Sequence, residues 1–269
     1  MPERKDGSHK GDYGKVFLLA GSEGMLGAGV LRSRGALRVG AGLVYLGVPL
    51  KARDAVNLVT PEVIVIGGEG AGDYLANALG ANAVAIGPGL GARRDLAREL
   101  LSKLSEEKYG APVILDADGL NAFAGDLEAL QKLKLKLIIT PHPGEMARLW
   151  GRRIEEIQPE RQKITQETAQ LLQCVVVLKG HQTVVVEGGG ASYINNTGNP
   201  GMASGGTGDV LTGMIAGLAA QGLASYNAAV AGVYLHGLAG DLAAKEKGAY
   251  GLIASDLVEK IPYAIQSNN

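Results

Sequence analysis

One polar, glycine-rich segment, residues 195–211, carries the clearest chemical signal in the chain. It reads Asn-Asn-Thr-Gly-Asn-Pro-Gly-Met-Ala-Ser-Gly-Gly-Thr-Gly-Asp-Val-Leu and leads directly into an apolar helical pattern. The first N–H groups of a helix have no partner within the helix, and they carry a partial positive charge. Glycine lets an anion come within hydrogen-bond reach of such a backbone. Residues 205–208 are therefore predicted to cradle a phosphate group.

Asp209 follows this predicted cradle within the first helical turn. An acid at a helix start complements the helix dipole, and that structural role alone could explain it. A carboxylate beside a bound phosphoryl group would repel it, however, so a purely stabilising role fits poorly here. A base that accepts the proton of a substrate hydroxyl fits the position better. The spacing favours Asp209 as a general base.

Further candidate residues follow apolar runs of strand length. Ligands of open α/β sheets bind beyond the carboxyl ends of the strands, where such residues would gather. The candidates are, in chain order, the Gly-Pro-Gly-Leu-Gly turn at 87–91, Asp116 with Asn121, His142 with Glu145, and Lys179.

Each of these candidates also has a plain structural explanation. The glycine turn could simply connect a strand to a helix tightly. His142 and Glu145 could form a strand-end turn and a helix start, and Lys179 could be a solvated hairpin lysine. The residues alone leave these alternatives open.

The elements that must position these residues follow from the apolar pattern. Most strand-length runs are continuous, which is typical of strands covered on both faces. The runs are 16–20, 43–48, 63–66, 83–86, 113–115, 137–139, 175–178 and 184–186, and the helical segments between them are 26–39, 51–58, 70–79, 93–107 and 154–172. Residues 174–195 look like an antiparallel meander, and helices are predicted over 207–221, 225–245 and 255–265. We expect a single α/β domain over 1–269, with a mostly parallel sheet, helices on both faces and a helical C-terminal third.

Composition excludes several functional classes. Lys and Arg number 26 against 27 Asp and Glu, so the net charge of −1 disfavours a nucleic-acid binder. The lone Cys174 excludes an intramolecular disulfide framework and a thiolate-rich metal site. No apolar stretch is long enough to span a membrane, and the polar start lacks a signal-peptide core, so a cytoplasmic protein is expected. The first strand ends without a G-x-G-x-x-G pattern, which disfavours a dehydrogenase of the dinucleotide-binding fold.

Nine ordered segments resemble those of one family, the ADP- or ATP-dependent NAD(P)H-hydrate dehydratases of the ribokinase-like superfamily. The resemblance covers about residues 8–257. Gly29 departs from the family pattern, which commonly has a second Ala there, and both residues are small. The segments are 10–14, 18–22, 25–29, 86–91, 115–121, 140–145, 178–183, 196–199 and 234–237, in addition to Gly-Gly-Thr-Gly-Asp at 205–209.

The resemblance implies repair of a damaged cofactor. NADH and NADPH can gain water across a ring double bond, and the family returns the S-epimer of this hydrate to NAD(P)H. It uses ADP or ATP with Mg²⁺ and releases AMP or ADP together with phosphate. ADP use, a homotetramer and the absence of a fused epimerase domain are further expectations. No hydride transfer is expected.

The family's site residues can be carried onto matching positions of this sequence. Glu145 would lie near the metal-bound phosphates without being a dedicated ligand. The catalytic group would be Asp209 with the cradle residues Gly206, Thr207 and Gly208. The hydrate would be bound by Ala28, Gly89, Asp116, Asn121, His142 and Asp209, and the nucleotide by Lys179, Gly180, His181, Gln182, Thr183, Asn196 and Gly208.

Two competing functions share part of this pattern. A vitamin-precursor kinase, acting on a thiazole or pyrimidine hydroxyl, would share Gly-Thr-Gly-Asp but should lack the segments at 140–145 and 179–183. A non-catalytic nucleotide-binding regulator would tolerate loss of Asp209, which is intact here.

Overall fold

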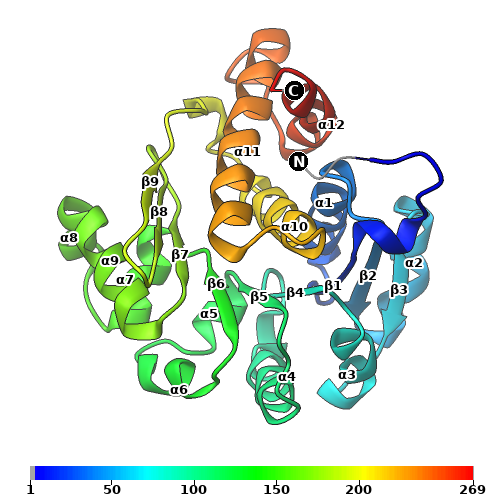
Figure 1. Ribbon diagram of the computed structural model, residues 1–269, viewed down its shortest axis with the longest axis horizontal. Coiled ribbons are helices and arrows are strands. Elements are labelled where there is room, and N and C mark those ends of the chain that lie inside the picture. The colour runs from blue at the N-terminus through cyan, green and yellow to red at the C-terminus, as the bar shows by residue number, and fades with distance from the viewer. Residues whose placement is uncertain (1–3, 269) are drawn as a thin grey trace.

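The computed structural model describes residues 4–268, and within them the strands form one nine-stranded sheet (Figure 1). The strand order across the sheet is β3-β2-β1-β4-β5-β6-β7-β8-β9. The strands are β1 (Lys15–Leu19), β2 (Leu43–Val48), β3 (Ile64–Gly67), β4 (Ala83–Ile86), β5 (Pro112–Leu115), β6 (Lys136–Ile139), β7 (Val175–Leu178), β8 (Val184–Glu187) and β9 (Ser192–Ile194).

The predicted mixture of parallel and antiparallel pairing is confirmed. Strands β1 to β7 pair in parallel, and β8 and β9 pair antiparallel beside β7 as the expected meander. Because the parallel strands run in one direction, the segments that follow β4, β5, β6 and β7 all emerge at the same edge of the sheet.

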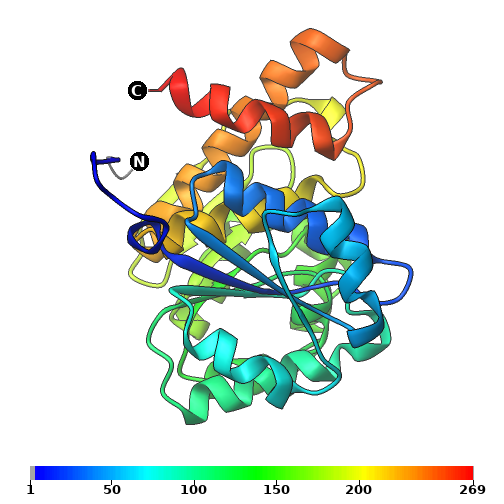
Figure 2. The ribbon, with the colours of Figure 1, turned by 90° about the vertical axis from the view of Figure 1, so that its right-hand side faces the viewer.

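Helices cover both faces of the sheet (Figure 2). Alternate side chains of each strand feed two separate cores: Val16 and Leu18 pack on one face, and Phe17 and Leu19 on the other. The first core contains α1 (Leu26–Arg38), α2 (Arg53–Val59), α10 (Thr207–Ala220), α11 (Ser225–Lys247) and α12 (Ala254–Gln266). The second contains α3 (Ala71–Leu79), α4 (Asp95–Glu106), α5 (Asp118–Asn121), α6 (Leu127–Lys132), α7 (Pro143–Trp150), α8 (Ile154–Ile157) and α9 (Arg161–Leu172).

Several predicted boundaries differ from the structure. The single helix expected over 154–172 is divided into α8, a 3-10 turn (Gln158–Glu160) and α9. Pro159 lies in that turn, and proline removes a backbone donor and clashes with the preceding helical turn. The last helix begins at Ala254, one residue early, and Asp256 accepts a hydrogen bond from the backbone N–H of Ile253. The short helices α5 and α6 were not predicted from periodicity.

Helix α10 is held against α1 by small residues. A Cβ added to Gly213 would lie 2.0 Å from the carbonyl oxygen of Arg32, and one added to Gly217 would lie 2.8 Å from that of Ala36. The two glycines therefore allow α1 and α10 to pack closely. This contact determines where the start of α10 lies relative to the sheet edge.

Among residues 4–268, no helix is both long enough and apolar enough to cross a bilayer.

Candidate functional site

The start of α10, where the sequence predicts a phosphate cradle, lies over the carboxyl edge of the parallel strands. Gly206 precedes the helix with a φ of +91°, a conformation that favours glycine. Its carbonyl accepts a hydrogen bond from the N–H of Val210, so the N–H groups of residues 207–209 precede the helical ladder. The Thr207 hydroxyl braces the loop by donating to the carbonyls of Met202 and Ser204, at 3.0 Å each. The backbone can therefore present several donors to one anion.

Asp209 is the third residue of α10 and is half-buried. Burial raises its pKa to about 6, and the charge of Asp116 adds to this rise, whereas Arg32 and Lys179 oppose it. A carboxylate with this pKa is ionised at neutral pH and can still accept a proton. Its surroundings thus suit the general base that the sequence predicts.

Lys179 points into the site and is not a solvated hairpin residue. It follows β7, its side chain is only 17 % exposed, and its Nζ lies 2.5 Å from Asp116 Oδ1 and 3.7 Å from Glu145 Oε2. Burial alone would lower the pKa of Lys179, but these two carboxylates raise it above its ordinary value. A Cβ added to Gly208 would lie 3.7 Å from Nζ, so the ammonium reaches the cradle.

Asp116 is buried next to α10 and is not open to solvent. It is 1 % exposed, and its oxygens accept hydrogen bonds from Lys179, from Thr212 Oγ1 at 2.8 Å and from Arg32 Nη2 at 3.4 Å. Lys179 and Arg32 together hold the pKa of Asp116 below its ordinary value, despite a burial effect that would raise it. These contacts give Asp116 a structural role beside Lys179, and its contact with the hydrate stays a prediction.

His142 and Glu145 cap the start of α7 and also face the site. His142 Nδ1 accepts hydrogen bonds from the N–H groups of Gly144 and Glu145, while Glu145 Oε2 accepts from the N–H of His142 at 2.7 Å. The pKa of His142 is lowered, mainly by burial, and burial raises the pKa of Glu145 to about 7. The capping contacts confirm the structural explanation, and they also orient a half-exposed imidazole, whose contact with the hydrate stays a prediction. The nearby Asn121 accepts a hydrogen bond from Arg148 Nε at 2.8 Å.

Two early loops, the one before α1 and the one after β4, lie against each other. Gly89 has a φ of +72°, and a Cβ added to it would lie 3.0 Å from the carbonyl oxygen of Met25 and 3.4 Å from Ala28 Cβ. The N–H of Gly21 donates to the carbonyl of Pro88 at 3.0 Å. Only glycine fits at position 89 without displacing the loop before α1.

A cavity of about 480 Å³ opens beside the cradle, on the side of two late loops, residues 179–183 and the loop after β9. It contains six of the seven residues expected at the nucleotide, and the exception, Asn196, is exposed between two lining residues. The lining comprises Lys179, Gly180, His181, Gln182, Thr183, Asn195, Thr197, Gly198, Asn199, Pro200, Met202, Ala203, Thr207, Gly208, Leu211, Val233, His236 and Gly237.

Part of this lining was not singled out from the sequence. Thr197 Oγ1 donates to the carbonyl of Tyr234 at 2.9 Å, which ties the loop after β9 to α11. His236 is buried within the fold, and burial lowers its pKa to about 4. Its Nε2 lies 2.8 Å from the carbonyl oxygen of Thr207, so a hydrogen bond from the neutral ring stabilises the start of α10. Only the resemblance of the segments at 196–199 and 234–237 pointed to this contact.

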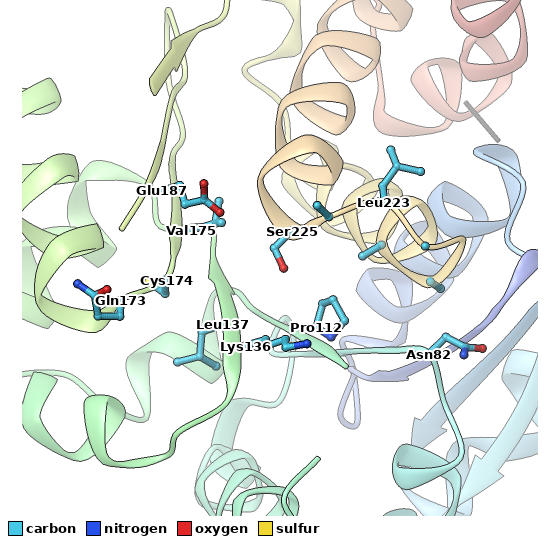
Figure 3. Close-up of a pocket in the computed structure, with 14 residues that line it drawn as sticks. Asn82, Pro112, Lys136, Leu137, Gln173, Cys174, Val175, Glu187, Leu223 and Ser225 are labelled. Atoms are coloured by element: carbon cyan, nitrogen blue, oxygen red, sulfur yellow. The ribbon is translucent and has the colours of Figure 1, made fainter. Parts of the chain in front are cut away.

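A second cavity, of about 540 Å³, lies at the opposite edge of the sheet (Figure 3). Its walls include Pro112 and Lys136, which begin β5 and β6, and Ser225, which begins α11. It is larger than the cavity at the cradle, but it lies far along the strands from Asp209, Lys179 and the early loops. Ligands of such sheets bind at the carboxyl edge, so we assign the functional site to the smaller cavity.

Within residues 4–268, no group of three or more His, Cys, Asp or Glu side chains is arranged to hold a metal ion. Glu145 is one of two acids that contact Lys179, the other being Asp116. Mg²⁺ keeps several waters and uses few protein carboxylates when it binds with phosphates, so one acid at this position fits its chemistry.

Known proteins are similar to this chain in both sequence and architecture. A family model described as NAD(P)H-hydrate dehydratase matches residues 16–263. The ADP-dependent (S)-NAD(P)H-hydrate dehydratase of Bacillus subtilis is 38 % identical, with 97 % of this chain and 92 % of that protein covered. The bifunctional NAD(P)H-hydrate repair enzyme of Moorella thermoacetica is 42 % identical over 99 % of this chain. The chain spans about half the length of the first three curated relatives, at 51–52 %.

Solved structures agree with the sequence comparison. The ADP/ATP-dependent NAD(P)H-hydrate dehydratase of Bacillus subtilis, co-crystallised with ATP and Mg²⁺, has a TM-score of 0.85 at 35 % identity. That match covers 100 % of this chain and 95 % of the other. Other solved structures described as ribokinases or ribokinase-like match with TM-scores of 0.84 and 0.55, which confirms the predicted fold class.

Proposed function

The chain belongs to the family of NAD(P)H-hydrate dehydratases, and from this premise we propose that it returns the S-epimer of hydrated NADH or NADPH to the intact cofactor. The reaction would use ADP, or less readily ATP, and release AMP or ADP together with phosphate. The observation that carries the proposal is Asp209, a half-buried base at the third position of a helix whose first N–H groups form an anion cradle.

The proposed chemistry is phosphoryl transfer followed by elimination. Asp209 takes the proton of the hydrate's ring hydroxyl, and the hydroxyl oxygen attacks the terminal phosphorus of the nucleotide. The bond from that phosphorus to the bridging oxygen breaks, and AMP leaves when ADP is used. The lone pair of the ring nitrogen then forms a double bond to the carbon that bears the new phosphate ester, and phosphate departs with the C–O bonding electrons. The neighbouring ring carbon releases a proton to water, which leaves the new ring double bond. The dihydropyridine ring is thereby restored with no change in oxidation state.

The protein's own groups contribute mostly position and charge. The N–H groups at 207–209 would stabilise the transferring phosphoryl group, where removal of one such donor typically costs about 10²–10³ in rate. Lys179 would supply a point charge to the same group. Bound Mg²⁺ would neutralise phosphate charge, and Glu145 is the residue that would hold it, through water.

The two ligands divide between the two sets of loops. The adenine nucleotide would occupy the cavity beside residues 179–183 and Asn195–Thr197, including the expected contact of Asn196. The hydrate would lie over Ala28, Gly89 and His142, with Asn121 at its margin. Both would meet at Asp209, the position that joins the two halves of the site.

We also infer that the chain assembles as a homotetramer in the cytoplasm. Leu58 is 86 % exposed, and Tyr250 is fully exposed, so copies of the chain have apolar side chains to cover. Light scattering after size-exclusion chromatography would measure the mass, and a monomer at micromolar concentration would contradict the assembly.

The reaction is tested by supplying NADH hydrate and ADP to the purified protein. Absorbance of the dihydronicotinamide and released phosphate are measured in the same sample. We expect one phosphate and one AMP for each NADH regained, and no recovery without nucleotide. A stable phosphorylated product would instead support the vitamin-kinase type of chemistry, and nucleotide binding without turnover would support a regulator.

A further inference from the structure

Arg32 is a buried cation with unused hydrogen-bonding capacity behind the cradle. It lies on α1, is 0 % exposed, and contacts Asp116 Oδ2 through Nη2 at 3.4 Å. Its Nε and Nη1 atoms are buried without a hydrogen-bond partner. Buried polar groups are normally bonded, so these two nitrogens require an explanation.

The carboxylate of Asp116, which pairs with Arg32, also pairs with a second cation, Lys179. Asp116 Oδ1 lies 2.5 Å from Lys179 Nζ, and its Oδ2 accepts a hydrogen bond from Thr212 Oγ1 at 2.8 Å. Asp116 is 1 % exposed, so water cannot replace a lost cation. Removing one partner of a buried ion pair is strongly destabilising, because the remaining charge is left uncompensated.

Lys179 also lies within reach of the cradle. Its Nζ lies 3.7 Å from the position of a Cβ on Gly208, in the wall of the cavity. A nucleotide phosphate at the cradle would compete with Asp116 for this ammonium. Lys179 can turn toward the phosphate at low cost only if Asp116 keeps another cation.

We propose that Arg32 is a positioning residue. When Lys179 turns toward the nucleotide phosphate, Arg32 forms a closer ion pair with Asp116 in place of Lys179. Its contact with Asp116 is long in the present arrangement, and its free nitrogens provide the donors for a closer pair. Arg32 thereby affects phosphate binding without touching the nucleotide. The inference rests on the proposed function, because it needs a phosphate at the cradle.

The test compares ADP with adenosine, which lacks phosphate, by calorimetry on the folded protein. In Arg32→Met, Lys179 should remain with Asp116, and the Kd for ADP should rise about tenfold, the loss expected for one charge-assisted contact. The Kd for adenosine should change less than about twofold. Arg32→Lys, which keeps the charge, should bind ADP more tightly than Arg32→Met does.

A second substitution separates this role from a packing role. In Arg32→Met/Asp116→Asn the neutral amide no longer holds Lys179, so ADP affinity should return toward that of the wild type. Equal weakening of ADP and adenosine, or no rescue in the double variant, would overturn the inference. If Arg32→Met does not fold, Arg32→Gln replaces it with the same expectation.

The result also distinguishes the inference from the function on which it rests. A wild-type protein that neither binds ADP nor restores NADH would contradict the proposed function. If the wild type binds ADP and Lys179→Met weakens that binding while Arg32→Met does not, only the role of Arg32 is wrong.

Discussion

At the scale of single residues, Asp209 is the proposed general base, and burial disfavours its ionised form. It is the third residue of α10, beside the cradle and near Lys179 and Asp116. We expect Asp209→Asn to lose at least about 10²-fold in turnover, because a general base typically contributes about 10²–10⁴. The Kd for ADP, measured by calorimetry, should stay equal or fall, since a negative charge beside an anion is removed.

Asp256 provides a matched control for this substitution. It is also the third residue of a helix, α12, and its carboxylate accepts a hydrogen bond from the N–H of Ile253. Asp256→Asn should keep near-normal turnover. If Asp209→Asn retains more than about a tenth of the wild-type rate, its role as general base is wrong.

The rate should depend on the ionisation of the same carboxyl group. Asp209 accepts a proton only when it is ionised, and its pKa is about 6. We therefore expect kcat/KM to fall about tenfold per pH unit below pH 6 and to level off above it. Initial rates of NADH recovery between pH 5 and pH 8 measure this limb. A rate that stays constant down to pH 5 would disagree with this assignment.

The raised pKa of Asp209 also predicts a trade-off with stability. The folded-state value of about 6 exceeds the ordinary 3.8, so between these values the folded protein binds a proton that the unfolded chain has released. Stability from this group is thus present below the ordinary pKa, is lost as pH rises through about 6, and does not change further at higher pH. Asp209→Asn, which cannot ionise, should have a higher Tm than the wild type at pH 7.5 and a similar Tm near pH 4. A lower Tm at pH 7.5 would contradict this sign.

At the scale of elements, the contact between α1 and α10 positions the whole cradle. Gly213 touches the backbone at Arg32, where an added Cβ would lie 2.0 Å from the carbonyl oxygen. Gly213→Val should therefore lower the free energy of unfolding by about 1–3 kcal/mol or more, the usual cost of overpacking. It should also reduce kcat, because α10 carries both the donors and the base. Urea denaturation and turnover assays measure the two effects.

Gly72 offers a helical glycine for comparison. It lies in α3, and a Cβ added there would meet nothing within 4 Å. Gly72→Ala should leave turnover unchanged and stability equal or slightly higher, because alanine is the better helix former. Similar effects of the two substitutions would show that the α1–α10 contact does not determine the site.

At the scale of the whole molecule, the two ligands should bind together. The cavity beside the late loops is lined by residues of 179–183, the loop after β9 and α11, while Gly89 and Ala28 meet on the other side of the cradle. We expect saturating NADPH to change the Kd for ADP by less than about threefold, well under the tenfold that corresponds to 1.4 kcal/mol. Each ligand should raise the Tm further in the presence of the other. Strict competition between NADPH and ADP would contradict two separate sites.

Much of the fold could be predicted because its signals are local. Continuous runs such as 83–86 and 175–178 are strands in the structure, since a strand covered on both faces needs apolar side chains on both. The helix start at Thr207 was predictable for the same reason, because the glycines before it and the acid in its first turn act locally. The division of 154–172 and the short helices α5 and α6 were missed, because turn geometry and packing outweigh periodicity there.

The tertiary structure decided which charges meet. Arg32, Asp116 and Lys179 are far apart in the chain, and no local pattern shows that Asp116 would be buried between two cations. The sequence left open whether Lys179 is a solvated hairpin residue. It lies beside the cradle because β5, β6 and β7 are parallel neighbours whose ends share one edge. The sequence by itself determined which groups can do chemistry. The sheet order determined their distances and burial, and through these their charge, because both desolvation and Coulomb interactions depend on position in space.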